Sequence, residues 1–197
     1  MSISAKDVKA LRDRTGAGMM DCKRALTETE GDIEAAIDLL RAKGAAKAAK
    51  RAEKETNEGT IGHYLHFGGR IGVMVEVNCE TDFVANTDDF KGLARDLAMH
   101  IAASNPVAVS ESDLPEELVA REKQVYLEQV KNEGKPDHIA EKIVEGKLRK
   151  FFEESTLMKQ AFVKNPDQTV EELVTAVSAK TGEKITVARF ARFSIGG

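Results

Sequence analysis

The spacing of apolar residues over roughly the first 45 positions predicts three short helices. Val8 and Leu11 begin an apolar stripe at helical spacing, and the preceding Ser4 begins a capping-box pattern. After the break at "TGAG", apolar residues recur at helical spacing on both sides of the turn "EGD", at Met19, Cys22, Ala25 and Leu26 and at Ile33, Ala36, Ile37 and Leu40. We expect a compact bundle that ends before Gly44, with an alanine-rich helical linker at 41–54.

Beyond the linker, the period of the apolar pattern changes, which predicts a sheet. The segments "GTIGHYLHF" and "RIGVMVEVNC" are rich in β-branched residues and flank a "GG" turn, as in a β-hairpin. The last segment, "KITVARFARFSIG", reads as a strand with Phe190 on one face and, on the other, Ile185, Val187, Ala191, Phe193 and Ile195. A three-stranded antiparallel sheet with helices on one face is the economical arrangement. Either a second copy of the chain or helices that curl around the sheet would cover the remaining face.

Further helical segments complete the predicted fold. One begins at Asp88 and has a single apolar face, formed by Phe90, Leu93, Ala94, Leu97, Ala98 and Ile101. Two long charged segments joined by "NEGKP" predict a protruding antiparallel hairpin at about 115–152, with its bend at Gly134 and Pro136. A capping-box pattern at Thr169 begins a last helix, which stops at Gly182.

These elements predict an α+β fold in two parts. Residues 1–54 would form the N-terminal three-helix bundle with its linker. Residues 55–197 would form a core and dimerisation domain, with the sheet, its packed helices and the helical hairpin.

Composition and charge exclude several classes of protein. The net charge of −4 with 31% charged residues describes a mixed-sign surface, which is typical neither of a polyanion mimic nor of a strongly basic nucleic-acid binder. The N-terminus has no apolar signal segment, and no window approaches the ~20 apolar residues that span a bilayer. We therefore expect a cytoplasmic protein without membrane contact. Cys22 and Cys79 lie in no CxxC or Cys/His cluster and are expected to be small buried or half-buried residues.

The sequence offers no residues for bond chemistry. His63 and His66 are three positions apart on a predicted strand, so their side chains point to opposite faces and cannot bind one metal ion. There is no phosphate-binding glycine motif and no nucleophile turn, which argues against an enzyme, a metal site or a bound cofactor. The basic helix at 43–54 could contact phosphate, but without interleaved aromatic residues a solvated connecting helix is favoured over direct nucleic-acid binding.

Two short segments suggest a contact surface. In "NCETDFVANTDDF", Phe83 lies in an acidic stretch, so its ring either folds inward as an anchor or is held outward as a wedge for another molecule. In "TGAGMM", two consecutive methionines cannot both face one small core. Methionine suits flexible contact surfaces, although filling an irregular core is its commoner role.

Together, "RTGAGMMDCKRAL" at 14–26 and "NCETDFVA" at 78–85 resemble the two signature segments of bacterial elongation factor Ts, the nucleotide-exchange factor for the translational GTPase elongation factor Tu. The resemblance extends over essentially the whole chain, including "RIGVMVEV", "GKPDHIAEKIVEGKLRKFFEE" and "QAFVK". It implies a bundle similar to ubiquitin-associated domains, followed by an α+β core with a helical hairpin.

The resemblance also implies which residues contact elongation factor Tu. Those of the first segment would meet its nucleotide-binding domain, which points to Arg12, Met19 and Met20. Those of the second are Thr81, Asp82, Phe83 and Val84, and the Asp-Phe pair would insert between helices of that domain near its magnesium and phosphate site. His66, in a "Tyr-x-His" context, would meet the third domain of the GTPase.

The resemblance further implies a homodimer, because longer family members have two tandem core subdomains and this chain has one. Two copies would pair through their sheets and grip the GTPase together. The implied function is release of GDP from elongation factor Tu so that GTP can bind. The alternative is a ubiquitin-associated-like binding and dimerisation module without exchange activity.

Overall fold

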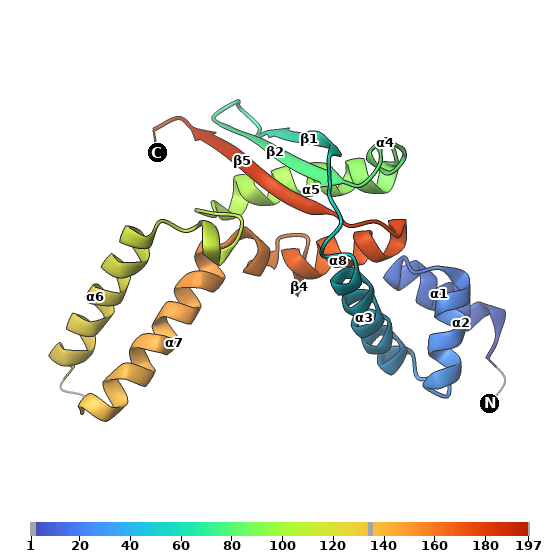
Figure 1. Cartoon of the computed structure of the whole chain (residues 1–197), viewed down its shortest axis with the longest axis horizontal. Coiled ribbons are helices and arrows are strands. Elements are labelled where there is room, and N and C mark those ends of the chain that lie inside the picture. Colours follow the sequence, from blue (N-terminus) through green and yellow to red (C-terminus); the bar gives the residue numbers. More distant parts are fainter. Residues whose placement is uncertain (1–2, 134–135, 197) are drawn as a thin grey trace. The chain divides into compact units, whose positions relative to one another are not determined.

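The computed structural model describes residues 3–133 and 136–196 of the chain (Figure 1). They divide into two compact units that do not follow chain order. Unit 1 contains the residues up to Gly62 together with Val75–Asp96 and Glu172–Ala188. Unit 2 contains His63–Met74, Leu97–Glu171 and the residues from Arg189 onward. The predicted division into residues 1–54 and 55–197 stays a prediction.

The N-terminal helical bundle has the three helices that the apolar stripes predict. They are α1 at Ala5–Thr15, α2 at Met19–Glu28 and α3 at Ile33–Lys50 (Figure 1). The predicted capping box is present, since the amide of Asp7 donates to Ser4 Oγ at 3.2 Å and the Asp7 carboxylate accepts from the Ser4 amide. The buried core of the bundle is formed by Val8, Leu11, Cys22, Ala25, Leu26 and Ala36.

Helix α3 differs from the prediction, because it runs through Gly44 without a break and takes in most of the expected linker. Gly44 is buried, and a Cβ atom built on it would lie 3.5 Å from the Cβ of Ala179. The glycine therefore marks a close approach between two segments of unit 1 and does not end the helix.

The sheet has three antiparallel strands, as predicted, and their order is β1-β2-β5. The strands are β1 at Glu58–Leu65, β2 at Ile71–Cys79 and β5 at Thr186–Ser194. The turn between β1 and β2 contains two glycines with φ of 83° and 70°, a backbone conformation that favours glycine. In β2 alternate residues are buried, at Val73, Val75, Val77 and Cys79.

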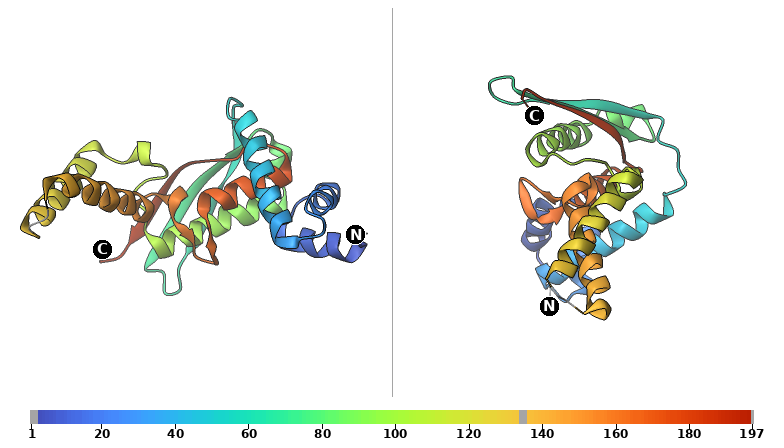
Figure 2. Two further views of the ribbon diagram at one scale, coloured as in Figure 1. Left: turned by 90° about the horizontal axis from the view of Figure 1, so that it is seen from below. Right: turned by 90° about the vertical axis from the view of Figure 1, so that its left-hand side faces the viewer.

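Helix α5, at Asp88–Ser104, covers one face of this sheet (Figures 1 and 2). Its predicted apolar face is confirmed, since each of its six members is at most 3% exposed: Phe90, Leu93, Ala94, Leu97, Ala98 and Ile101. The backbones approach closely at Gly62, where an added Cβ would lie 2.3 Å from the carbonyl oxygen of Ala94. A glycine in β1 therefore allows α5 to pack directly on the strand.

The residues expected to share one face of β5 do not share one environment. Val187 is buried, whereas Phe193 is 71% exposed and Ile195 is 63% exposed. Between them, the Arg192 guanidinium donates to the carbonyl oxygen of Ala102 on α5, with Nη2 3.3 Å from that oxygen. In this half of the strand Arg192 is directed to the helix, and Phe193 is left exposed.

In unit 2, α6 at Glu116–Asn132 and α7 at Asp137–Ser155 lie side by side in every view (Figures 1 and 2). This confirms the helical hairpin expected at about 115–152. Of the two residues predicted at its bend, Gly134 lies outside the described residues, and Pro136 is the N-cap of α7. Val130 and Val144 are its buried apolar residues.

A second, two-stranded sheet was not predicted. It pairs β3 at Ala161–Phe162 with β4 at Asn165–Thr169 and precedes α8 at Val170–Thr181. The buried His100 anchors it, because its Nδ1 accepts from the Val163 amide at 3.2 Å. The sequence "NPDQT" of β4 contains residues that are depleted in strands, so pattern alone does not indicate a strand there.

Candidate partner-binding site

The short helix α4, at Asp82–Ala85, determines how the ring of Phe83 is presented. Thr81 is its N-cap, and its hydroxyl accepts from the Val84 amide at 3.4 Å. Val84 and Ala85 are buried and attach the turn to unit 1, whereas Phe83 is 79% exposed. Of the two interpretations of this ring, the structure has the outward one.

The far end of α4 is also fixed. The Asn86 side-chain amide donates to the carbonyl oxygen of Asp82 at 3.0 Å, and the Thr87 hydroxyl donates to the carbonyl oxygen of Val84 at 2.8 Å. Thr87 Oγ also accepts from the amide of Phe90, which begins the buried face of α5. The two phenylalanines of this stretch therefore have opposite roles: Phe90 anchors the core and Phe83 faces solvent.

An ion pair lies directly before α4. Arg51 donates twice to the Glu80 carboxylate, with Nε–Oε1 and Nη2–Oε2 distances of 2.8 and 2.9 Å. The same carboxylate accepts from the amide of Lys184 at 2.6 Å. These donors, the Arg51 guanidinium first, lower the pKa of Glu80 from 4.5 to about 2. Glu80 is therefore ionised at neutral pH and joins three separate segments of unit 1.

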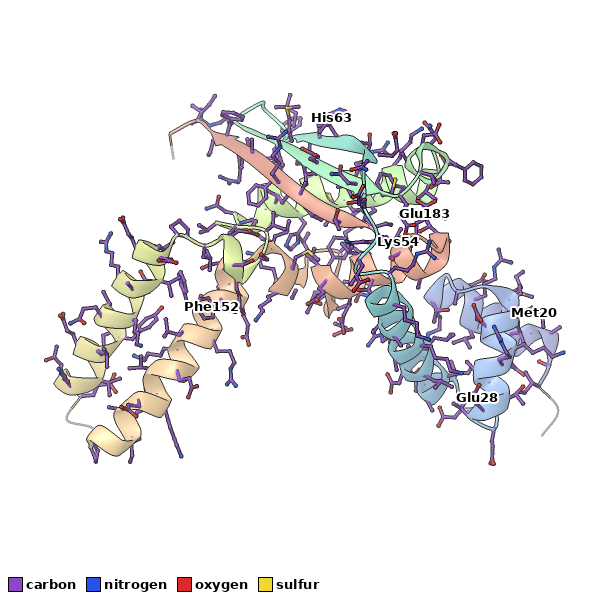
Figure 3. The ribbon with its side chains drawn as sticks, viewed as in Figure 1. Met20, Glu28, Lys54, His63, Phe152 and Glu183 are labelled. Atoms are coloured by element: carbon purple, nitrogen blue, oxygen red, sulfur yellow. The ribbon has the colours of Figure 1, made fainter. Side chains whose placement is uncertain are left out.

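A second carboxylate holds the same turn from the junction of α8 and β5, where Figure 3 labels Glu183. Its Oε2 accepts from the amides of Glu80 and Thr81 at 3.1 and 3.0 Å, and its Oε1 accepts from the Thr81 hydroxyl at 2.6 Å. The Nζ atom of Lys184 donates to the carbonyl oxygens of Ala52 and Lys54 at 2.6 and 2.8 Å, just beyond α3.

The first expected contact segment is also exposed. Met19 and Met20 begin α2 after the N-cap Gly18 and are 45% and 67% exposed, respectively. Arg12 on α1 is exposed as well. Both methionines therefore lie outside the bundle core, which Cys22 helps to fill instead.

His66 lies in unit 2, apart from the other expected contact residues, which belong to unit 1. It is exposed at the end of the β1–β2 hairpin, and the Tyr64 hydroxyl lies 3.1 Å from its Nδ1.

Sequence reasoning missed Arg51, Glu183 and Lys184. The Arg51–Glu80 pair spans 29 positions of sequence, and the Lys184–Glu80 bond spans 104. No local pattern links residues so far apart. The sequence pointed to this region only through the segment "NCETDFVA", which contains Glu80 but neither Arg51 nor Lys184.

Other candidate features do not form a site. Cys22 and Cys79 are free and buried, and burial raises the pKa of each thiol. Within residues 3–133 and 136–196 no cluster of histidine, cysteine or acidic side chains could hold a metal ion. None of the helices described is both long enough and apolar enough to cross a membrane.

The structure defines an α+β protein with an N-terminal helical bundle and an exposed aromatic ring on a fixed turn. A family model described as "Elongation factor TS" matches residues 4–197. The elongation factor Ts of Desulfosudis oleivorans is 58% identical over 195 residues, covering 99% of this chain and 98% of that protein. The elongation factor Ts of Thermosipho melanesiensis is 55% identical over 194 residues, covering 98% of this chain and 99% of that protein.

The elongation factor Ts of Moorella thermoacetica is 57% identical over 194 residues, covering 98% of this chain and 96% of that protein. The chain therefore belongs to the elongation factor Ts family. This membership gives it a role in the elongation phase of translation.

Proposed function

We propose that this chain is the guanine-nucleotide exchange factor for elongation factor Tu. It binds the GDP complex of the GTPase, disturbs the magnesium and phosphate site and promotes release of GDP, so that GTP can bind. The observation that carries the proposal is the 79% exposure of Phe83 on a turn whose neighbours are buried or hydrogen-bonded. An apolar ring that a fixed turn holds outward is available as an anchor for a pocket of another molecule.

Exchange of this kind needs no bond chemistry in the factor. The nucleotide is held by backbone amides and a magnesium ion, and displacing the segments that carry them weakens its binding. By linkage, the factor weakens nucleotide binding as much as the nucleotide weakens factor binding, so incoming GTP releases the factor. The factor is therefore not an enzyme in the sense of making or breaking a bond, and it requires no cofactor.

Phe83 cannot supply the required free energy alone. Burying one phenylalanine ring yields roughly 1.5–3 kcal/mol, whereas weakening nucleotide binding about a thousandfold requires about 4 kcal/mol. The remainder comes from the exposed residues of the bundle, Arg12, Met19 and Met20, and from His66. Asp82 adds negative charge beside the ring, close to the magnesium site of the bound partner.

The test is release of labelled GDP from elongation factor Tu, measured with wild-type factor and with Phe83→Ala. We expect the variant to bind the GTPase and to release GDP at least about tenfold more slowly at saturating factor, because the lost ring burial of about 1.5 kcal/mol corresponds to that ratio. A folded Phe83→Ala that releases GDP as fast as wild type would refute the wedge. Binding of wild-type factor without any release would instead favour the binding and dimerisation module.

The exposed apolar side chains of unit 2 support a homodimer through the core sheet. The most exposed of these side chains are Phe67 at 97%, Phe193 at 71%, Leu65 at 68%, Ile195 at 63% and Met74 at 55%. All belong to the strands of the three-stranded sheet, to the hairpin turn or to the residue that follows β5. A patch of this kind is typical of a surface that another chain covers.

Sedimentation equilibrium tests the dimer. Wild type should have twice the mass of one chain, and Phe193→Asp should shift the mass towards one chain, because a buried unpaired carboxylate opposes association. Val163→Asp, at a residue that is 40% exposed in the turn between β3 and β4, is the matched control and should leave the mass unchanged. A single-chain mass for wild type at all concentrations would refute the dimer.

A further inference from the structure

The carboxylate of Glu183 makes three contacts with the two residues that precede the exposed aromatic turn. Two of them are to the backbone amides of Glu80 and Thr81 and the third is to the Thr81 hydroxyl, at 3.1, 3.0 and 2.6 Å. Amides at the beginning of a helix have no partner within the helix, so an acceptor from elsewhere in the chain is needed to satisfy them. Here that acceptor comes from a residue 102 positions away from Thr81.

The contact with the hydroxyl has a second effect on α4. Because Glu183 Oε1 accepts the Thr81 hydroxyl proton, the lone pairs of Thr81 Oγ remain available to accept from the amide of Val84. Val84 is buried and Phe83 precedes it in the same turn. The orientation of the hydroxyl, the N-cap and the direction of the ring are therefore connected through one carboxylate.

The position of Glu183 is itself fixed from both sides. Its carbonyl oxygen accepts from the Ser178 hydroxyl on α8. Its neighbour Lys184 donates its amide to the Glu80 carboxylate at 2.6 Å. The carboxylate therefore extends from a well-anchored junction, and it is available as a rigid acceptor for the turn.

We propose that Glu183 is a positioning residue for nucleotide exchange: it fixes the N-cap of α4 so that Phe83 is presented to the partner in one orientation. The inference rests on the proposed function of Phe83. Glu183 acts through Thr81 and makes no contact with the partner. A ring that enters a neighbouring protein gains most when its orientation is fixed before binding, because less conformational freedom is lost in the complex.

The first test concerns the free factor and does not depend on exchange activity. Hydrogen exchange of the Thr81 and Val84 amides should be at least about tenfold faster in Glu183→Ala than in wild type, because these amides lose their acceptor or their cap. Glu145→Ala, an exposed glutamate on α7, is the matched control and should leave both amides unchanged. Unchanged exchange of both amides in Glu183→Ala would overturn the proposal.

The second test is a double-mutant cycle on GDP release at saturating factor. Glu183→Ala should slow release roughly tenfold, while Glu183→Ala combined with Phe83→Ala should be no slower than Phe83→Ala alone. If Glu183 had a purely structural role, Glu183→Ala would instead slow GDP release by the same factor in the wild-type protein and in Phe83→Ala. Additive losses, or wild-type release by Glu183→Ala, would overturn the proposal.

Glu183→Gln keeps the test decisive if the alanine variant folds poorly. Its side-chain oxygen can still accept from the two amides, but its NH2 group then faces the Thr81 hydroxyl and cannot accept from it. We expect release between that of wild type and Glu183→Ala, and wild-type release together with unchanged amide exchange would overturn the proposal. If Phe83→Ala releases GDP normally while the amide exchange changes as expected, the proposed function fails and the structural role of Glu183 stands.

Discussion

The two phenylalanines of the acidic stretch provide a direct test of the structure through stability. Phe90 is fully buried, and replacing a buried phenylalanine by alanine costs about 3–5 kcal/mol. Phe83 is 79% exposed, so only about a fifth of the roughly 1.5–3 kcal/mol gained by burying such a ring, about 0.3–0.6 kcal/mol, is at risk. The same substitution seven residues apart is therefore expected to differ about fivefold or more in its cost.

These costs convert into separable melting temperatures. For a chain of 150–250 residues, 1 kcal/mol shifts Tm by about 2–4 °C, so Phe90→Ala should lower Tm by about 6–20 °C and Phe83→Ala by about 2 °C or less. The measurement is thermal unfolding followed by circular dichroism, with all proteins at one concentration because association would shift Tm. Phe90→Leu, which leaves a smaller cavity, replaces Phe90→Ala if the latter does not fold.

One result would refute the reasoning. If Phe83→Ala lowers Tm as much as Phe90→Ala, the ring at position 83 is buried in the free protein and cannot serve as an outward wedge. A small loss at both positions would instead mean that α5 does not pack as described.

Three further predictions concern the stability of the fold. The pKa of Glu80 is lowered from 4.5 to about 2, so between these pH values the unfolded chain binds more protons than the folded chain. The stability that the ion pair with Arg51 contributes is therefore present above pH 4.5 and is lost as pH falls toward 2. Urea unfolding between pH 2 and 6 should therefore depend less on pH in Glu80→Gln than in wild type. Gly62→Ala should destabilise by about 1–3 kcal/mol, because its Cβ would lie 2.3 Å from the Ala94 carbonyl oxygen. Gly146→Ala in α7, where the space is open, should stabilise by up to about 1 kcal/mol in the same unfolding assay.

Elements with strong local signals were predictable from the sequence. Helix α1 begins where the capping box at Ser4 indicates, and α5 buries the six residues of its apolar stripe. The three-stranded sheet followed from alternation and from the need of the last strand for partners. In these segments local propensity and tertiary packing favour the same structure, so pattern was sufficient.

Tertiary context decided the features that the sequence did not predict. Gly44 indicated a helix end, but the nearby Ala179 makes a small residue suitable within the helix. The β3–β4 hairpin contains Asn165 and Pro166, which are rare in strands. It is anchored by the hydrogen bond from the Val163 amide to His100, which lies 63 positions earlier in the chain. The direction of the Phe83 ring likewise depends on partners that no local pattern contains.

Helix α4 illustrates why such distant contacts are required. It has four residues, far fewer than the ~12–15 that an isolated helix needs to be even marginally stable in water. Without buried neighbours and caps, the segment would fluctuate and the exposed ring would fold back onto apolar surface. Val84 and Ala85 supply the burial, Thr81 supplies the N-cap, and Glu183 fixes Thr81. The ring can therefore stay outward because its short helix is fixed at both ends, so under the proposed function a change at Glu183 should slow GDP release as a change in the ring does.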